Sequence, residues 1–349
     1  MRALVVTPGK MDSLALVDVP EPSPAEGSVL VEALALGLCG TDVEIVSGVY
    51  GQAPSGREVL VLGHENLGRV MEAPAGSGVS VGDLVVGIVR RPDPVPCPAC
   101  AAGEWDMCRN GQYTEHGIMR LDGFARERWR AEPDAMVTVD ASLSDVGVLL
   151  EPTTIVAKAW EQVQRIGARA FHDPHVAVVT GAGPVGLLAA LLGVQIGLEV
   201  HVFDRVTDGP KPDLVRSLGA TYHHESVPDS GVTADITIEC TGVAEVIADV
   251  LANSAPDAIT CLTGVSTPGS PLPFDLGGWN RGAVLGNDVV FGTVNANRRH
   301  YQAAAIALKA ADQDWLNRLI TRRVPLASFS DAFARRPEDV KVVLDLQAQ

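Results

Sequence analysis

The sequence predicts a two-domain α/β protein in which one domain is built on a doubly wound parallel sheet. The chain has 349 residues, which is long enough for two domains. Residues 172–294 alternate short apolar runs with helical patterns, and this alternation is typical of a parallel sheet with crossover helices. Residues 1–150 are rich in glycine and proline and carry short alternating runs, such as 28–34, which predict irregular β structure with long loops.

The parallel sheet is predicted from four short apolar runs, at residues 175–180, 199–204, 234–239 and 258–264. Helical patterns follow two of these runs, at residues 185–197 and 243–252. From about Asn295 the chain carries a further helical pattern at 299–311 and a short closing strand near 340–346.

The composition limits the classes of function. Hydrophobic residues make up 46% of the chain and charged residues 20%, so a large core can form and disorder is not expected. The formal net charge of −16 argues against a nucleic-acid partner, which usually requires a basic surface. No apolar run is long enough to span a bilayer, and no targeting segment is visible at the N-terminus. We therefore expect a soluble, cytoplasmic protein with no membrane partner.

A glycine-rich motif follows the first predicted strand of the parallel sheet. Residues 181–186 read Gly-x-Gly-x-x-Gly at the point where a strand passes into a helix. The first glycine allows a tight turn, the second lets the backbone approach a pyrophosphate, and the third lets helix and strand pack closely. The helix N-terminus offers N–H groups to the phosphates. The motif predicts a Rossmann dinucleotide-binding domain, with a purely structural turn as the alternative; the candidate contacts are Gly181, Gly183, Pro184, Val185 and Gly186.

Asp204 and Arg205, at the end of the next strand, bear on the choice of nicotinamide cofactor. Asp204 ends that strand, where an acid accepts a hydrogen bond from the ribose 2′-hydroxyl of NAD. A carboxylate at this position would repel the 2′-phosphate of NADP. Arg205 follows directly and would offset that repulsion. NAD is therefore the expected cofactor, and NADP remains the alternative.

Cys39, His64 and Glu151 form a plausible zinc set. They supply three protein ligands and leave a fourth position for water or substrate, as catalytic zinc sites do. Each residue also has a structural interpretation: a buried cysteine often serves core packing, a lone histidine is often hydrogen-bonded in the fold, and Glu151 would suit the first turn of a helix. The combination of the three favours zinc.

A second cluster contains three of the six cysteines. Cys97 and Cys100 form a C-x-x-C pair, and Cys108 lies eight residues further on. In a chain expected to be cytoplasmic, such clustering indicates metal binding more than a disulfide framework. The spacing suggests a structural zinc, but three thiolates alone do not complete a four-thiolate site.

The order of these motifs resembles the zinc-dependent medium-chain alcohol dehydrogenases over essentially the whole chain. The motifs are Cys39-Gly-Thr-Asp, Gly63-His-Glu, the cysteine cluster, Glu151-Pro and Gly181-Ala-Gly-Pro-Val-Gly. Further segments are similar to the prokaryotic glucose 1-dehydrogenase branch of that family: Val89-Arg-Arg-Pro, Glu115-His-Gly-Ile, Asp122-Gly-Phe, Leu150-Glu-Pro-Thr and Gly292-Thr-Val-Asn.

The resemblance implies roles for individual residues. Cys39, His64 and Glu151 match the catalytic zinc ligands, and Glu65 matches a residue at or near the metal. Thr41 matches the residue whose hydroxyl touches the substrate oxygen, with Glu44 or Glu65 passing the proton outward. The set implied to contact substrate is Thr41, Glu65, Glu115, Glu151 and Asn295, and Asn295 also matches a position near the nicotinamide. A solvated loop acid is the alternative interpretation of Glu115.

The resemblance also implies the domain plan and one departure from it. Residues 1–155 would form a GroES-like β catalytic domain completed by 295–349, and 156–294 would form the Rossmann dinucleotide-binding domain. The family's cysteine lobe holds four cysteines, whereas the first of them falls here at Pro94. A structural zinc therefore requires Asp93 as a substitute ligand.

These expectations converge on an enzyme. A zinc-dependent dehydrogenase that passes a hydride from C1 of a glucose-like aldose to NAD or NADP, giving the lactone, is the leading hypothesis. A zinc dehydrogenase of another polyol, cyclitol or secondary alcohol shares the same metal and cofactor residues and differs only in the substrate pocket. A non-enzymatic cofactor-binding role is disfavoured by Cys39, His64 and Glu151. A homodimer or homotetramer is expected.

Overall fold

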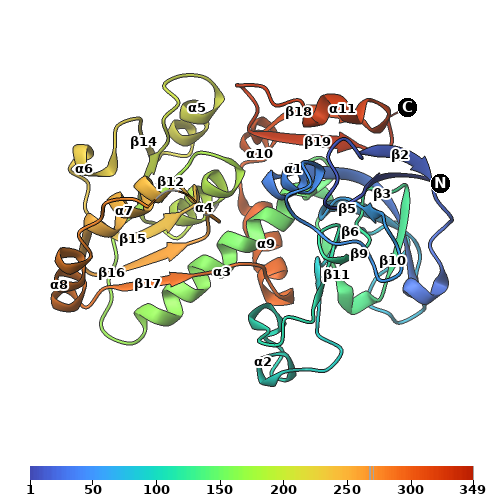
Figure 1. Cartoon of the computed structure of the whole chain (residues 1–349), viewed down its shortest axis with the longest axis horizontal. Coiled ribbons are helices and arrows are strands. Elements are labelled where there is room, and N and C mark those ends of the chain that lie inside the picture. The colour runs from blue at the N-terminus through green and yellow to red at the C-terminus, as the bar shows by residue number, and fades with distance from the viewer. Residues whose placement is uncertain (267–268, 270, 349) are drawn as a thin grey trace. The chain divides into compact units, whose positions relative to one another are not determined.

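The computed structural model describes residues 1–266, 269 and 271–348, and the chain divides into two compact units. The first unit comprises residues 1–151 together with 295–349, and the second comprises 152–294 (Figure 1). The first unit is mainly β structure, and the second alternates strands and helices. Among the described residues, no helix is both long enough and apolar enough to cross a membrane.

The largest sheet of the first unit is organised around the long strand β3, Val29–Leu38. The strands follow the order β11-β6-β5-β3-β19-β18, and β10 also pairs with β3. Every second residue in the first half of β3 is buried, as expected for a strand with one face on the core. The other strands are β5 (Glu65–Glu72), β6 (Leu84–Gly87), β10 (Arg128–Ala131), β11 (Met136–Val139), β18 (Ile320–Pro325) and β19 (Lys341–Asp345).

The C-terminal tail is part of this sheet. Strand β19 runs antiparallel to β3, with Val342 opposite Leu38, and parallel to β18. The tail reaches β18 through helices α9 (Arg298–Ala310) and α10 (Gln313–Leu319). Helix α11 (Phe329–Phe333) then connects β18 to β19. The tail therefore contributes residues to the same layer as the N-terminal segment, although more than 300 positions separate Leu38 from Val342 in sequence.

Two small sheets and short helices complete the first unit. One sheet has the order β2-β1-β4 and the other has the order β7-β8-β9. Their strands are β1 (Arg2–Val6), β2 (Ala15–Asp18), β4 (Leu60–Val61), β7 (Arg90–Arg91), β8 (Thr114–His116) and β9 (Arg120–Leu121). Besides α9, α10 and α11, the α-helices of this unit are α1 (Gly40–Val46), α2 (Pro98–Ala101) and the start of α3 (Leu150–Gly167).

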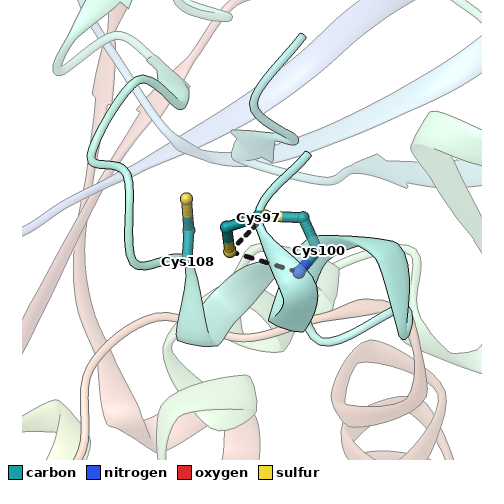
Figure 2. Close-up of side chains that lie close together, drawn as sticks. All are labelled: Cys97, Cys100 and Cys108. Carbon is teal, nitrogen blue, oxygen red and sulfur yellow. Dashed lines mark hydrogen bonds between the residues drawn. The ribbon is translucent and has the colours of Figure 1, made fainter. Parts of the chain in front are cut away.

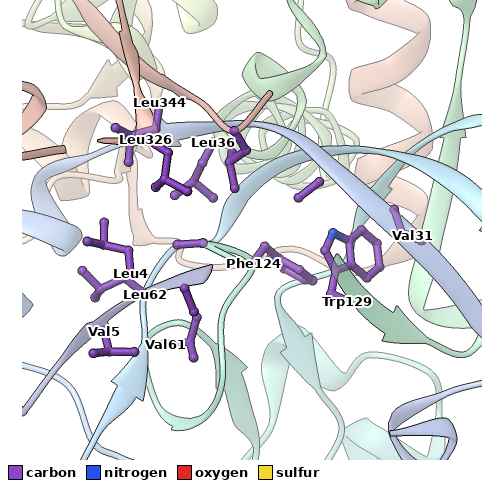
Figure 3. Packing of buried hydrophobic residues seen from close by; sticks show 14 of the residues in the cluster. Leu4, Val5, Val31, Leu36, Val61, Leu62, Phe124, Trp129, Leu326 and Leu344 are labelled. Carbon is purple, nitrogen blue, oxygen red and sulfur yellow. The ribbon is translucent and has the colours of Figure 1, made fainter. Parts of the chain in front are cut away.

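An apolar cluster joins the largest sheet to the β2-β1-β4 sheet (Figure 3). Trp129 and Phe124 pack edge to face with ring centroids 4.9 Å apart, and both are essentially fully buried. Gly87 makes room for them, because a Cβ there would lie 2.6 Å from the Phe124 ring. Leu344 from the C-terminal tail belongs to the same cluster. The tail is therefore anchored by burial as well as by strand pairing.

The second unit is a six-stranded parallel sheet in the order β14-β13-β12-β15-β16-β17. The strands are β12 (Val176–Thr180), β13 (Glu199–Phe203), β14 (Thr221–His223), β15 (Ala234–Glu239), β16 (Ser254–Leu262) and β17 (Val289–Gly292). The helices between them are α4 (Pro184–Gln195), α5 (Pro210–Ser217), α6 (Val227–Ser230), α7 (Ala244–Ala252) and α8 (Leu276–Gly286). The order reverses between β12 and β15, which is the switch point where such sheets bind ligands.

The observed architecture confirms the predicted fold class, a GroES-like β domain plus a Rossmann-type parallel sheet. The four apolar runs become β12, β13, β15 and β16, although β16 starts at Ser254, four residues before the predicted start. Strands β14 and β17 were not predicted, because three- and four-residue segments carry too little periodicity.

Candidate active site

The loop after β3 forms the first part of the candidate metal centre. Cys39 immediately precedes helix α1 and caps it: its Sγ accepts the N–H of Thr41 at 3.3 Å. The Cys39 N–H in turn donates to Asp42 Oδ2 at 3.0 Å. Asp42 is completely buried. These reciprocal hydrogen bonds fix both side chains at the N-terminus of α1.

His64 lies between the Cys39 thiol and the Asp42 carboxylate. Its Nε2 is 3.1 Å from Cys39 Sγ, and its Nδ1 is 3.4 Å from Asp42 Oδ1. Although burial lowers the pKa of His64, the charges of Cys39 and Asp42 outweigh burial and raise it well above its usual value. For the Asp42 carboxyl, burial has the opposite effect and raises the pKa, but the interaction with His64 brings it below its usual value. The three side chains form a thiol–imidazole–carboxylate series.

Glu65 follows His64 at the start of β5 and faces a buried lysine. Lys341, the first residue of β19, forms an ion pair with Glu65 Oε2 and donates to the carbonyl oxygen of Leu38 at 3.0 Å. Both charged side chains are almost inaccessible to solvent. Ligand atoms of Cys39, His64 and Glu65 lie within 4.8 Å of one another, so these three residues could hold one metal ion.

Glu151 occupies the first turn of α3 and is buried. Burial raises its pKa to about 7, with a further upward contribution from the charge of Glu65 and opposing contributions from His64 and Lys341. Glu151 therefore lies within electrostatic reach of the Cys39–His64–Glu65 group, although it is not one of the residues whose ligand atoms converge within 4.8 Å.

Thr41 and Glu44 lie on one face of α1, one helical turn apart. Thr41 is half-buried beside Cys39, and Glu44 is exposed. Helix α1 therefore places one polar side chain beside the candidate metal centre and a second one in solvent.

Glu115 is buried and ion-paired, which excludes its alternative interpretation as a solvated loop acid. Its Oε1 accepts hydrogen bonds from Arg90 Nε at 3.0 Å and Arg90 Nη2 at 2.9 Å. Asn295 Nδ2 donates to the same oxygen at 2.7 Å. The Arg90 guanidinium also stacks 3.7 Å above the Tyr113 ring. Strands β7 and β8 bring Arg90 and Glu115 directly opposite each other, and Asn295 takes a left-handed backbone conformation, with φ of 61°.

The glycine motif forms the turn between β12 and α4. Gly181 has a φ of 86°, which favours glycine. Gly183 caps α4, and Pro184 and Val185 form its first turn. A Cβ on Gly186 would lie 1.8 Å from the Gly181 carbonyl oxygen, so only glycine fits there. At Gly183 nothing lies within 4 Å of an added Cβ, which leaves open space beside the helix N-terminus.

Asp204 is engaged on both carboxylate oxygens. Its Oδ2 accepts the Ala182 N–H at 2.8 Å and Lys211 Nζ at 3.0 Å, and its Oδ1 accepts the Val206 N–H at 3.2 Å. Asp204 thereby braces the glycine-rich turn. Together with Gly181, Arg205 and Lys211 it lines a cavity of about 470 Å³ at the carboxyl ends of β12 and β13.

The three cysteines of the second cluster converge, as Figure 2 shows. The Sγ atoms of Cys97 and Cys100 are 3.6 Å apart, and Cys97 Sγ accepts the N–H groups of Cys100 and Arg109. These hydrogen bonds lower the pKa of Cys97 to about 6. Asp93 is buried, with its Oδ2 4.0 Å from Cys108 Sγ. Its Oδ1 accepts the N–H of Val95 at 2.8 Å.

Four residues of these sites were missed in the sequence: Asp42, Arg90, Lys211 and Lys341. Asp42 carried a usable signal, because an acid three residues after a helix-capping cysteine can close a capping box. Lys341 carried only a weak one, a lysine at the start of an otherwise apolar strand. Its partner Glu65 is 276 positions away in sequence, and the two meet only because β3 pairs with both β5 and β19.

Comparison with known proteins covers the whole chain. Residues 25–141 match the model of the alcohol dehydrogenase GroES-like domain, and residues 144–346 match that of the glucose dehydrogenase C-terminus. Glucose 1-dehydrogenase from Thermoproteus tenax is 42% identical over 99% of this chain and 100% of its own length. The corresponding enzyme from Methanocella arvoryzae is 38% identical over the full length of both.

A solved structure has the same fold. Glucose dehydrogenase from Haloferax mediterranei, in complex with NADP, zinc and gluconolactone, superposes with a TM-score of 0.92. The two sequences are 31% identical, and the match covers 100% of both chains. The family matches, the identities and the shared fold agree with the resemblance seen in the motifs. The chain belongs to the glucose dehydrogenase branch of the medium-chain alcohol dehydrogenase family.

Proposed function

We propose that this protein is an NAD(P)-dependent zinc dehydrogenase that oxidises C1 of glucose, or of a closely related aldose, to the lactone. The observation that carries the proposal is the group formed by Cys39, His64 and Glu65, of which His64 and Glu65 are buried, in a chain that also holds a complete Gly-x-Gly-x-x-Gly turn. The Thermoproteus and Methanocella relatives are named as glucose 1-dehydrogenases, and the Haloferax structure contains NADP, zinc and gluconolactone. We assign catalysis to the first unit and dinucleotide binding to the second.

The residues present fit a zinc ion. Sulfur, nitrogen and carboxylate oxygen are the donors that zinc takes in proteins, and Cys39, His64 and Glu151 supply one of each. The buried atoms Asp42 Oδ1 and His64 Nδ1 face each other at 3.4 Å without a hydrogen bond. A carboxylate beside the outer nitrogen is the usual way to orient a metal-binding histidine. The acidic group formed by Asp42, Glu65 and Glu151 also favours a bound dication.

The chain's own residues prepare the substrate for oxidation. When bound, zinc would supply Lewis acidity at the C1 hydroxyl, and the nicotinamide would supply the hydride acceptor. Thr41 would receive the hydroxyl proton as its own hydroxyl proton passes to Glu44 or Glu65. Glu44 is the better placed of the two carboxylates for release to water, because it is exposed whereas Glu65 is buried.

Glu115 and Asn295 supply the polar contacts that a sugar requires. Glu115 is held in place by two hydrogen bonds from Arg90 and one from Asn295, so its carboxylate is oriented before substrate arrives. A buried group built to bond a hydroxyl rejects substrates that lack it, because the group is then left unpaired. These residues therefore favour a polyhydroxylated substrate over a simple alcohol.

The cavity beside Asp204 would hold the adenosine ribose. Gly183 and the N-terminus of α4, with Pro184 and Val185, would receive the pyrophosphate. Asp204 favours NAD by charge, but Lys211 and two backbone N–H groups already engage it, and Arg205 lies beside it. Both NAD and NADP are consistent with this arrangement.

The first test is catalytic. The purified protein should reduce NAD or NADP with glucose, followed by the absorbance of the reduced nicotinamide. Dialysis against a chelator should abolish turnover, and added zinc should restore it. Short alcohols should give a kcat/KM lower by roughly a hundredfold or more, because they lack the additional hydroxyl groups that Glu115 and Asn295 would contact.

Two outcomes would contradict this prediction separately. Full activity of rigorously metal-free protein would exclude the zinc mechanism. Turnover of alcohols or other polyols with none of aldoses would exclude the sugar assignment and leave the zinc dehydrogenase in place. As a residue-level control, Glu115→Gln should lower kcat/KM for glucose without changing the zinc content.

A second prediction separates two glycines of the nucleotide turn. Gly186→Ala places a methyl group against the Gly181 carbonyl and should destabilise the protein by about 1–3 kcal/mol in urea unfolding. Gly183→Ala meets nothing within 4 Å and should change stability by less than about 0.5 kcal/mol. Its methyl group would nevertheless occupy the pyrophosphate position, so affinity for NADH or NADPH should fall roughly tenfold, or about 1.4 kcal/mol. Unchanged binding by Gly183→Ala would refute the assigned pyrophosphate position.

A third prediction concerns the cysteine cluster. We propose that Cys97, Cys100 and Cys108 bind a structural zinc, with Asp93 as the fourth ligand after a small movement. Elemental analysis should then give two zinc ions per chain, and both Cys100→Ser and Asp93→Ala should reduce this to one while catalytic zinc is retained. One zinc per wild-type chain, with unchanged content in both variants, would show that the cluster binds none.

A fourth prediction concerns assembly. We propose that the enzyme works in the cytoplasm as a homodimer or homotetramer. Strand β17 lies at an edge of the parallel sheet, and α8, which precedes it in the chain, exposes Leu276, Val284 and Leu285. Apolar side chains beside an open sheet edge favour association with a second copy. Light scattering should give twice or four times the chain mass, and Leu285→Glu should lower it; a monomeric wild type would contradict the proposal.

A further inference from the structure

Asp106 is a buried acid that neither the metal centre nor the nucleotide turn uses. It is 4% exposed and belongs to the short 3-10 helix Trp105–Met107, which leads directly into Cys108 of the cysteine cluster. Burying a carboxylate is costly unless hydrogen bonds or an opposite charge compensate for the lost water. The contacts of Asp106 therefore indicate what this acid holds in place.

Asp106 contacts two segments that also hold Glu115. Its carbonyl oxygen accepts a hydrogen bond from Arg90 Nη1 at 3.2 Å, and its Oδ1 accepts one from Asn297 Nδ2 at 2.8 Å. Arg90 also donates twice to Glu115. Asn295, which donates to Glu115 once, lies two residues before Asn297. The contacts close into a ring, and its members apart from Asn295 are all buried.

The short segment between Asn295 and Asn297 is well fixed. The Oδ1 of Asn295 accepts the N–H of Ala296 at 2.8 Å. Asn297 caps helix α9, because its Oδ1 accepts the N–H of Arg299 at 3.1 Å and its own N–H donates to His300 Nδ1 at 3.1 Å. A displacement of Asn297 would therefore be passed on to Asn295 and to its contact with Glu115.

The ring determines the direction of one free oxygen. All three side-chain hydrogen bonds of Glu115 end on Oε1, and among the described residues no group donates to its Oε2. A carboxylate is planar, so anchoring Oε1 from several sides sets the direction in which Oε2 points. Oε2 is thus the oxygen of Glu115 that is left for a sugar hydroxyl.

The cysteine cluster supports Asp106 from its other side. Ahead of the 3-10 helix, the Glu104 N–H donates to the Ala99 carbonyl oxygen at 2.9 Å. Beyond it, the Arg109 N–H donates to Cys97 Sγ at 3.4 Å. Both contacts are independent of Arg90 and Asn297, so Asp106 is a fixed point on which the ring is built.

We propose that Asp106 is a positioning residue that sets the direction of Glu115 Oε2, through Arg90 and Asn297, and so determines how strongly the site selects for a sugar hydroxyl. The inference rests on the proposed function and adds a residue that governs its specificity. Asp106 itself contacts neither substrate nor cofactor. A plain structural role, in which Asp106 only stabilises the cysteine cluster, predicts lower stability with unchanged selectivity.

The test measures selectivity. For each monodeoxy analogue of glucose that retains the C1 hydroxyl, the selectivity ratio is kcat/KM for glucose divided by kcat/KM for the analogue. A site that bonds a hydroxyl discriminates against the analogue that lacks it. Glu115→Gln replaces a charged acceptor with a neutral and weaker one, so the analogue whose ratio falls in this variant identifies the hydroxyl that Glu115 contacts.

Asp106→Ala should lower the selectivity ratio for that analogue by roughly tenfold, the scale of one buried hydrogen bond. Its affinity for NADH or NADPH without sugar should stay unchanged. Asp106→Asn, whose side-chain oxygen can still accept from Asn297, should retain most of the ratio. A lower melting temperature of Asp106→Ala with a wild-type ratio would overturn the inference.

Asp339→Ala is the matched control for loss of a buried acid. The Asp339 side chain is 7% exposed, and it bonds the Arg322 guanidinium and the Arg336 N–H. Its removal should lower stability and leave every selectivity ratio unchanged. A fall in the ratio of this control equal to that of Asp106→Ala would show that the loss is unspecific and would also overturn the inference.

A second variant keeps the inference testable if Asp106→Ala folds poorly. Asn297→Ser retains a side chain that can cap α9 but removes the amide that donates to Asp106. It should lower the same ratio, and combining it with Asp106→Ala should bring little further loss, because both act on one contact. Fully additive losses would contradict the proposed route. Wild type that oxidises no aldose, or a Glu115→Gln variant that retains every ratio, would instead contradict the proposed function.

Discussion

The candidate metal centre depends on the pairing of β3 with β5 on one side and with β19 on the other. Strand β3 ends at Leu38 and delivers Cys39 to the cap of α1, β5 begins at Glu65 directly after His64, and β19 begins at Lys341. Sheet register fixes these three strand ends relative to one another. A shift of one residue in either pairing would turn Glu65 or Lys341 to the opposite face of the sheet.

This arrangement concentrates negative charge where water is excluded. Asp42, Glu65 and Glu151 are all buried, and the charges of His64 and Lys341 oppose the effect of burial on the pKa of Asp42 and of Glu151. Burial raises the pKa of Glu151 to about 7, and the negative charges of Glu65 and Asp42 add to this effect. A divalent cation would oppose both effects. The same electrostatic imbalance therefore explains both the buried lysine and the expected affinity for zinc.

Much of the fold and part of the site could be predicted from the sequence because their structural requirements are local along the chain. The glycine turn is local: a tight turn, a close packing contact and a helix N-terminus all fall within residues 181–186, so their requirements appear side by side in the sequence. Cys39, His64 and Glu151 were recognisable as zinc-type ligands by residue type and by resemblance. Strands β14 and β17 are too short to show a period.

The remaining residues could not be predicted because their roles are set by tertiary pairing. Lys341 gains its role only when β19 pairs with β3, and Arg90 only when β7 lies opposite β8. The engagement of Asp204 was also invisible, since the motif alone suggests a free acid, whereas the fold directs Lys211 and the Ala182 and Val206 N–H groups onto it. Charge at a position in sequence is therefore a poor guide to charge available to a ligand.

The central claim is that Cys39 and His64, together with Glu65 or Glu151, hold one zinc ion. Anomalous diffraction measured on either side of the zinc absorption edge, from crystals of the purified protein, tests it most directly. The account predicts a zinc peak bonded to Cys39 Sγ, His64 Nε2 and the carboxylate of Glu65 or Glu151. No peak beside Cys39 and His64 in zinc-loaded crystals would contradict it.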